Sequence, residues 1–265
     1  MESKIHIYRA KSPIIATAIH DGHSIAPSLR SNMLLSEHER MREEDPYTAE
    51  MINFPVNRIV VDNSRFMVDL NRPRDRAIYR SPNDAWGLAV WATKLTQEQE
   101  EEILTFYDTF YLEVKKVLLD LIQSYGYFIV LDVHSYNHRR KDPYIEAISS
   151  ENPEINIGTA NNISKWRPII DTFIDSLSKT TIDDHFPDVR ENIKFKGGTF
   201  SNWICSQYSK FGCVLSVEFK KTFMDEWTGR VNISHLMDIQ RALQASILPL
   251  ETELKKLYQT ASTDK

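Results

Sequence analysis

The sequence has little cysteine, no excess of positive charge and no long apolar run. Its two cysteines are too far apart for a C-x-x-C pair, which excludes a cysteine-ligated zinc framework and favours a reduced, cytoplasmic environment. Lysine and arginine number 32 against 37 acidic residues, a net charge of −5 that argues against a nucleic-acid partner. No run approaches the ~18 apolar residues of a membrane span, and residues 1–15 lack the apolar core of a signal peptide, so we expect no membrane association.

The composition that remains is that of an ordinary globular protein. The chain has 265 residues, 42% of them hydrophobic, and no repeat or low-complexity linker divides it, so we predict one domain over residues 1–265. Short β-branched runs alternate with amphipathic stretches. Strands are predicted over 13–20, 58–63, 65–71, 127–134, 155–160, 193–197 and 213–219; helices are predicted over 96–126, 164–179 and 234–259, the last kinked or interrupted at Leu248-Pro249.

This alternation of strands and helices predicts a layered α/β domain with a mostly parallel sheet. The run at 127–134 is apolar on both faces, which is typical of a central parallel strand. In such sheets ligands bind outside the carboxyl ends of the strands. Polar residues at the strand ends are therefore the first candidates for function.

Two histidines meet that criterion. His20 ends the first predicted strand and His134 ends the strand at 127–134. Imidazole is the commonest protein ligand of zinc, and a catalytic zinc has three protein ligands and one open position. His23, Glu44 and Asp45 are the candidates for the third ligand. The alternative is that each histidine is a hydrogen-bonded structural residue.

The segment 62–76 places cationic and amide side chains close together. On an extended chain Arg65 and Asn71 would share a side, while the position of Arg72 depends on the turn that follows it. Arginine binds carboxylates through two parallel hydrogen bonds, so these residues would suit an acidic small molecule. The alternative is a surface strand whose arginines pair with Asp69 and Asp75.

A carboxylate also lies inside the apolar run 213–219. Burial would raise the pKa of Glu218, which suits a general base; the alternative is a buried ion pair with a lysine or arginine. Gly197-Gly198 allows a positive φ or close approach of a ligand, but it is not a phosphate-binding P-loop, because no G-K-[ST] follows.

Seven short motifs, in order along most of the chain, resemble the N-formylglutamate amidohydrolase (deformylase) family, which is related to zinc carboxypeptidases and aspartoacylase. The resemblance implies a three-layer α/β/α fold with a central mixed, mostly parallel sheet of the zinc carboxypeptidase (phosphorylase/hydrolase-like) type. The motifs are IHDG, EEDPYT, SRFMVDLNRPRD, LDVHS, NIGTA, FKGG and VEFKKTFMDE.

The resemblance also implies a set of ligands for one zinc ion. His20, Asp45 and His134 would bind the metal, with Asp45 preferred over Glu44 and His23. Asp132, two residues before His134 on the same strand face, is the candidate to orient the His134 ring.

For the substrate, the resemblance implies that Asn71 and Arg72 hold a carboxylate and that Arg65 stabilises the oxyanion. Glu218 would activate water and pass a proton to the leaving amine. The expected activity is zinc-dependent hydrolysis of an acidic N-acyl amino acid such as N-formylglutamate. Alternatives are a carboxypeptidase- or amidase-like hydrolase of another N-acyl substrate and a non-catalytic metal-binding relative. We expect the loop carrying His138, Arg139 and Arg140 to face either substrate or solvent.

Overall fold

A single mixed sheet forms the centre of the protein. Over residues 5–263, which the computed structural model describes (side chains to residue 259), seven strands pair in the order β1-β3-β2-β4-β7-β5-β6. Strands β2, β3, β4 and β7 are mutually parallel, whereas β1 is antiparallel to β3 and β5 is antiparallel to β7. The strands are β1 (Ile5–Tyr8), β2 (Ile14–Ala18), β3 (Asn57–Val61), β4 (Phe128–Tyr136), β5 (Ile155–Gly158), β6 (Val189–Glu191) and β7 (Gly212–Lys220).

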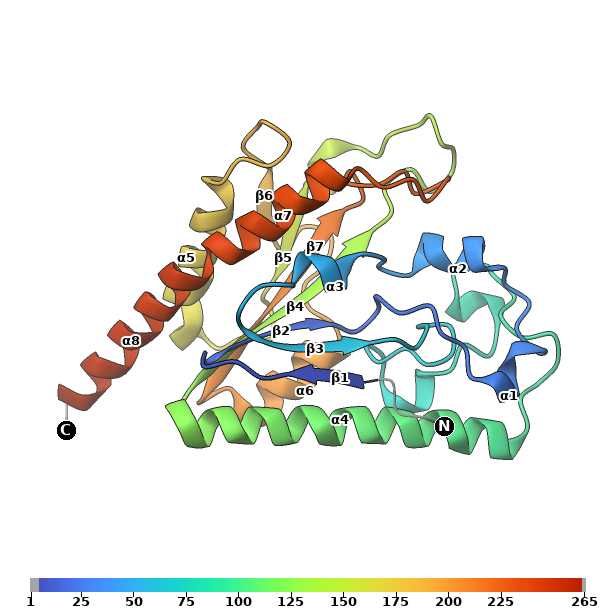
Figure 1. Ribbon diagram of the computed structural model, residues 1–265, viewed down its shortest axis with the longest axis horizontal. Helices are drawn as coiled ribbons and strands as arrows, with labels where there is room; N and C mark the ends of the chain where they lie inside the picture. The colour runs from blue at the N-terminus through green and yellow to red at the C-terminus, as the bar shows by residue number, and fades with distance from the viewer. Residues whose placement is uncertain (1–4, 264–265) are drawn as a thin grey trace.

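Helices cover both faces of this sheet, which confirms the three-layer α/β/α prediction (Figure 1). One apolar cluster packs α3, α5, α7 and α8 against one face, and a second packs α1, α4 and α6 against the other. The helices are α1 (Pro27–Arg30), α2 (Glu37–Glu43), α3 (Thr48–Met51), α4 (Gln97–Tyr125), α5 (Arg167–Ser178), α6 (Thr199–Tyr208), α7 (Ile233–Ala245) and α8 (Ile247–Thr263). None of the described helices is both long and apolar enough to cross a membrane.

The longest helix, α4, begins and ends where the sequence predicts. Thr96 and Gln99 form a capping box at its start, and Gly126 ends it in the left-handed conformation. The buried side chains recur at helical spacing and lie along one side of the sheet, as at Ile103 and Phe110. Local signals and tertiary packing therefore agree along this helix.

Two of the predicted strands are wrong. Residues 65–71 form successive turns, because the carbonyl of Ser64 accepts hydrogen bonds from the amides of Met67 and Val68. Residues 193–197 are not a strand either; the side chain of Asn156 holds the Lys194 amide, and the edge strand is β6 instead. Strand β1 was not predicted.

The C-terminal helical stretch is interrupted at Ser246, two residues before the predicted position at Leu248-Pro249. Helix α7 ends at Ala245 and α8 begins at Ile247, with Ser246 between them. The proline at 249 explains the position of the break, because a proline ring clashes with the carbonyl four residues earlier, which is that of Ala245.

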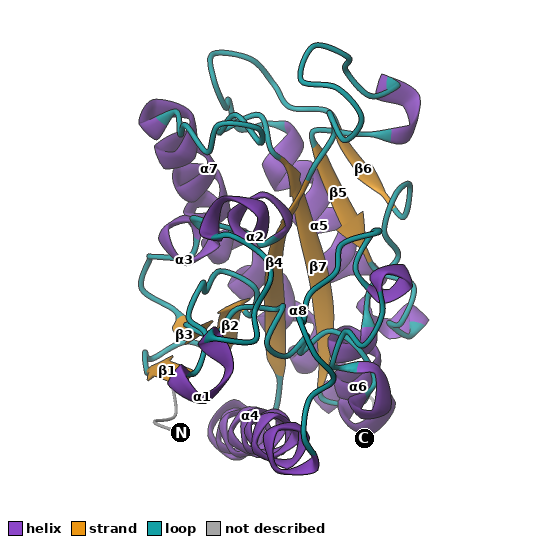
Figure 2. Ribbon diagram, turned by 90° about the vertical axis from the view of Figure 1, so that its right-hand side faces the viewer, coloured by secondary structure: helices purple, strands orange, loops and turns teal. Residues whose placement is uncertain are grey.

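The four parallel strands bring distant segments to one edge of the sheet. His20 follows β2, residues 62–72 follow β3, and His134 and Glu218 lie near the carboxyl ends of β4 and β7. In the turned view β4 and β7 lie side by side at the centre of the sheet (Figure 2). The carboxyl edge is therefore where the candidate site residues meet.

Candidate metal centre and active site

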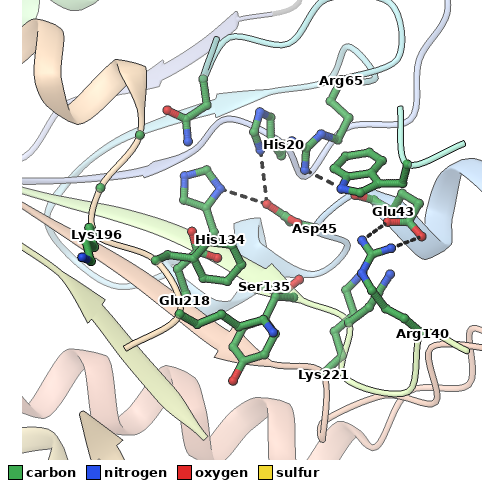
Figure 3. Close-up of a pocket in the computed structure, with 18 residues that line it drawn as sticks. His20, Glu43, Asp45, Arg65, His134, Ser135, Arg140, Lys196, Glu218 and Lys221 are labelled. Carbon is green, nitrogen blue, oxygen red and sulfur yellow. Dashed lines mark hydrogen bonds and ion pairs between the residues drawn. The ribbon is translucent and has the colours of Figure 1, made fainter. Parts of the chain in front are cut away.

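A cavity of about 350 Å³ opens at this carboxyl edge (Figure 3). Most of the residues expected to act at the site line it, together with several cations to which the sequence assigned no role. The lining consists of His20, Glu43, Asp45, Arg65, Asn71, Trp86, His134, Ser135, Tyr136, Asn137, Arg140, Lys194, Phe195, Lys196, Gly197, Gly198, Glu218 and Lys221.

Three buried side chains converge at the base of the cavity. Nδ1 of His134 lies 2.9 Å from Oδ2 of Asp45, and Nδ1 of His20 lies 3.4 Å from the same oxygen. Potential ligand atoms of the three residues all lie within 4.8 Å of one another. Burial would raise the pKa of Asp45, but the two histidines outweigh burial, so the carboxylate is held ionised.

The outer nitrogen of each histidine faces a second carboxylate. Nε2 of His20 lies 2.8 Å from Oδ1 of Asp69, and Nε2 of His134 lies 3.1 Å from Oδ2 of Asp132. Carboxylates in this position fix the ring so that the other nitrogen is free to bind a metal. The contact of Asp132 was expected from its place on the strand, whereas Asp69 was considered only as a partner for an arginine.

The donor set fits a zinc ion. Nδ1 of His20 is buried and has no hydrogen-bond partner among the described residues, although it points towards the Asp45 carboxylate. Two neutral imidazoles and one carboxylate are ligands that suit zinc and leave a coordination position open.

The local chain path favours Asp45 among the three candidates for the third ligand. Helix α2, capped by Ser36, ends at Glu43, and the chain then turns into the site. The Asp45 amide donates to the carbonyl of His20. Glu44 and His23 instead pair with each other, with Nδ1 to Oε2 at 2.5 Å, and line no part of the cavity.

Glu218 lies on β7 directly opposite His134 on β4. Burial raises the pKa of Glu218 to about 7, with nearby Asp45 and Asp132 adding to the rise against the opposing effect of His134. Among the described residues no lysine or arginine forms an ion pair with it, so the alternative of a buried ion pair is not what the structure contains.

Arg65 lines the cavity beside the metal-site residues. Its Nη2 donates to Asp69 at 2.9 Å, and its Nη1 donates to the carbonyl of Glu43 at 3.4 Å. Burial would lower the pKa of Arg65, but Tyr79 and the Asp69 carboxylate beside it hold that pKa well above its ordinary value. Arg65 therefore forms the ion pair with Asp69 and also lines the cavity.

Asn71 and Arg72 are not brought to the same place. Asn71 lines the cavity against Gly198, where an added Cβ would come within 2.2 Å of its Oδ1. Arg72 is absent from the lining: its Nη2 donates to the carbonyl of Asp84, and its guanidinium lies over the Tyr79 ring. Gly198 therefore allows the close approach of the Asn71 side chain, rather than that of a ligand.

The cavity mouth carries cations that the sequence reasoning did not place. Arg140 binds Glu43 with both of its terminal nitrogens, at 3.2 and 2.6 Å, and lies 5.4 Å from the Trp86 ring. Lys196 lines the wall formed by the segment before α6. No periodic pattern in the sequence distinguishes Arg140 or Lys196 as site residues. The one signal for them is their position in or near the motifs LDVHS and FKGG.

The loop after β4 separates Arg140 from its neighbour His138. The His138 amide donates to Glu226, and its side chain lines a different surface hollow. Of the three residues expected in this loop, only Arg140 therefore reaches the cavity.

Comparison with known proteins places the fold and the family. The family model for N-formylglutamate amidohydrolase matches residues 12–223. No curated protein matches the chain. The solved structure of N-formylglutamate amidohydrolase from Ralstonia eutropha JMP134 is 15% identical, with a TM-score of 0.73 over 97% of this chain and 99% of the other.

Two further solved structures match the chain. A gene product of Agrobacterium tumefaciens is 16% identical, with a TM-score of 0.63 over 91% of this chain and 95% of the other. A metallo-carboxypeptidase from Burkholderia cenocepacia is 14% identical, with a TM-score of 0.40 over 95% of this chain and 61% of the other.

Proposed function

The chain belongs to the N-formylglutamate amidohydrolase family, and we propose that it is a zinc-dependent hydrolase of N-acyl amino acids of the N-formyl type, such as N-formylglutamate. The family supports an amidohydrolase. The observation that carries the rest is the buried convergence of His20, Asp45 and His134 beside Glu218.

His20, Asp45 and His134 would hold the metal, with Asp69 and Asp132 orienting the two rings. A zinc ion held there would polarise the substrate carbonyl and lower the pKa of water. The protein fixes the positions of these three buried ligands: the two histidines lie near the ends of β2 and β4, and Asp45 lies in the turn after α2.

Glu218 would move the proton. As a carboxylate it takes a proton from the water whose oxygen adds to the amide carbon. It then gives that proton to the amine nitrogen as the C–N bond breaks, which yields a carboxylic acid and a free amine. A pKa near 7 suits both steps, because the group can accept and release a proton near neutral pH.

Arg65 would stabilise the negative charge that develops on the carbonyl oxygen. Its hydrogen bonds to Asp69 and Glu43 fix the guanidinium at the cavity wall before substrate enters. Such preorganised charge requires little rearrangement during the reaction.

The substrate carboxylate requires a cation that reaches the cavity. The cations Arg140 and Lys196 line it, and we propose that they bind the carboxylate together with the amide of Asn71, which also lines the cavity. The role proposed for Arg72 would need its guanidinium to leave the Asp84 carbonyl and the Tyr79 ring. Arg72 thus has weaker support than Arg140.

The proposal is tested by metal analysis of the purified protein together with a turnover screen across N-formyl, N-acetyl and N-succinyl amino acids. We expect one zinc per chain and the fastest hydrolysis with an acidic N-formyl amino acid. Hydrolysis of peptides or other amides with no preference for these compounds would favour the carboxypeptidase-like alternative. Bound zinc without any turnover would favour a non-catalytic relative.

A further inference from the structure

Lys221 is a buried cation that the proposed reaction does not use. It follows β7, its side chain is 1% exposed, and among the described residues it forms no ion pair with a carboxylate. Its Nζ donates to the carbonyl of Arg42 at 2.6 Å and to the carbonyl of Glu44 at 2.7 Å. Burying an ammonium group is costly in free energy, and these two hydrogen bonds offset part of that cost.

The two carbonyls are those that a helix end leaves without partners. Helix α2 ends at Glu43, and the last carbonyls of a helix have no amide of their own helix to accept from. They also carry the negative end of the helix dipole, which a cation stabilises. The carbonyl between them, that of Glu43, accepts from Arg65, so three successive carbonyls each receive a cationic donor.

This arrangement fixes the peptide bond that precedes Asp45. Its carbonyl, from Glu44, accepts from Lys221, and its amide donates to the carbonyl of His20 at 3.0 Å. Because a peptide group is planar, holding both of its ends sets the direction in which the Asp45 side chain leaves the backbone. One end is held by another proposed metal ligand and the other by a residue three positions after Glu218.

We propose that Lys221 is a positioning residue that fixes the peptide before Asp45 and so sets the affinity and geometry of the metal site. The inference rests on the proposed metal centre but assigns a role that the reaction itself does not require. Lys221 would couple the strand that carries Glu218 to the turn that carries Asp45.

The neighbouring lysine provides a matched control. Lys220 is on the same strand end, but its Nζ donates to the carbonyl of Asn152 at 3.3 Å and does not line the cavity. The same substitution at Lys220 and at Lys221 therefore removes one lysine in each case. Only the substitution at Lys221 removes a hydrogen bond to the turn before Asp45.

The experiment compares the full-length wild type with Lys221→Met, Lys221→Arg and Lys220→Met. Zinc affinity is measured by competition with a chromogenic chelator, the Co²⁺-loaded proteins are compared by their visible absorption spectra, and thermal unfolding of the metal-free proteins reports on folding. We expect Lys221→Met to lower zinc affinity by about 10- to 100-fold, as loss of outer-shell support does, and to change the Co²⁺ spectrum. Lys220→Met should stay within about twofold, and Lys221→Arg, which keeps a cationic donor, should recover part of the loss.

If Lys221→Met folds and binds zinc with wild-type affinity and an unchanged Co²⁺ spectrum, the proposal is overturned. If Lys221→Met does not fold, Lys221→Arg decides: weakened zinc binding with a shifted spectrum supports the proposal, and wild-type values in both contradict it. A wild-type protein that binds no metal would overturn the proposed function as well, which separates the two failures.

Discussion

His134 and Glu218 lie directly opposite each other on the paired parallel strands β4 and β7. This register places a proposed metal ligand beside the proposed general base. We predict that Glu218→Gln lowers the turnover number by about 10²- to 10⁴-fold, the contribution typical of general acid–base groups. Bound zinc should remain, because the amide leaves His20, Asp45 and His134 in place.

The measurement for this variant is turnover together with zinc content. Glu113→Gln is the matched control, because Glu113 is a partly exposed residue of α4 whose one ion-pair partner among the described residues is Lys116. The control should keep wild-type turnover. Near-normal turnover in Glu218→Gln would remove the general-base assignment.

The raised pKa of Glu218 predicts a pH effect on the stability of the metal-free protein. Its side chain has a pKa of about 7 when folded, above the ordinary value of 4.5. Between these values the unfolded chain has lost the proton and the folded chain retains it, so wild-type stability falls relative to Glu218→Gln as pH rises. The difference in Tm should grow from about pH 4.5 to 7 and then level off. A difference that does not vary with pH would contradict the burial of this carboxyl group.

Asp69 supports the site through its contact with His20, so we predict that Asp69→Asn weakens zinc binding by about 10- to 100-fold. The same carboxylate also accepts from Arg65 and from the hydroxyl of Tyr79, so the Tm should fall as well. Chelator competition and thermal unfolding measure the two effects.

Asp62→Asn is the control for this change. Asp62 also pairs with a histidine, His6, at 2.8 Å, but that pair is largely exposed. An exposed pair is worth only about 0–1 kcal/mol, so zinc affinity should not move and the Tm should change little. Equal effects of the two variants would mean that Asp69 has no special role in the metal site.

Arg140 and Arg72 can be separated by their effects on KM. Arg140 lines the cavity, whereas Arg72 is absent from the lining and its guanidinium lies over the Tyr79 ring. We predict that Arg140→Ala raises KM for N-formylglutamate about tenfold or more, the loss expected for a charge-assisted hydrogen bond of about 1.5–3 kcal/mol. Arg72→Ala should raise KM less. The reverse order would support the role originally predicted for Arg72.

The site residues that could be predicted from the sequence are those at or near the ends of strands. Strand β4 and the position of His134 near its carboxyl end can be predicted from an apolar run, and the position of His20 follows from the same rule. Asp45 could be placed among three candidates but not selected by residue pattern alone. Its selection depends on the turn after α2 and on a hydrogen bond to the His20 carbonyl, contacts between segments far apart in the chain.

The segment after β3 is where the secondary structure predicted from the sequence is wrong. An alternating apolar pattern at 65–71 resembles a strand, but the chain turns there through bonds to Ser64 and Asp69. Side chains therefore do not alternate between two faces, although Arg65 and Asn71, which the sequence places on one side, both line the cavity. The sequence did not predict a role for Lys221. Its hydrogen-bond partners are the backbone carbonyls of Arg42 and Glu44, which no pattern of residue types identifies.

The most direct test of the central claim is the hydrolysis of N-formyl-L-glutamate by chelator-treated protein before and after titration with zinc, followed as release of formate. The account predicts no turnover without metal and a rise in turnover that saturates at one zinc per chain, with the Glu218→Gln protein binding the same zinc but remaining inactive. Undiminished turnover in the chelated protein, or none at full zinc occupancy across the N-acyl amino acids, would contradict it.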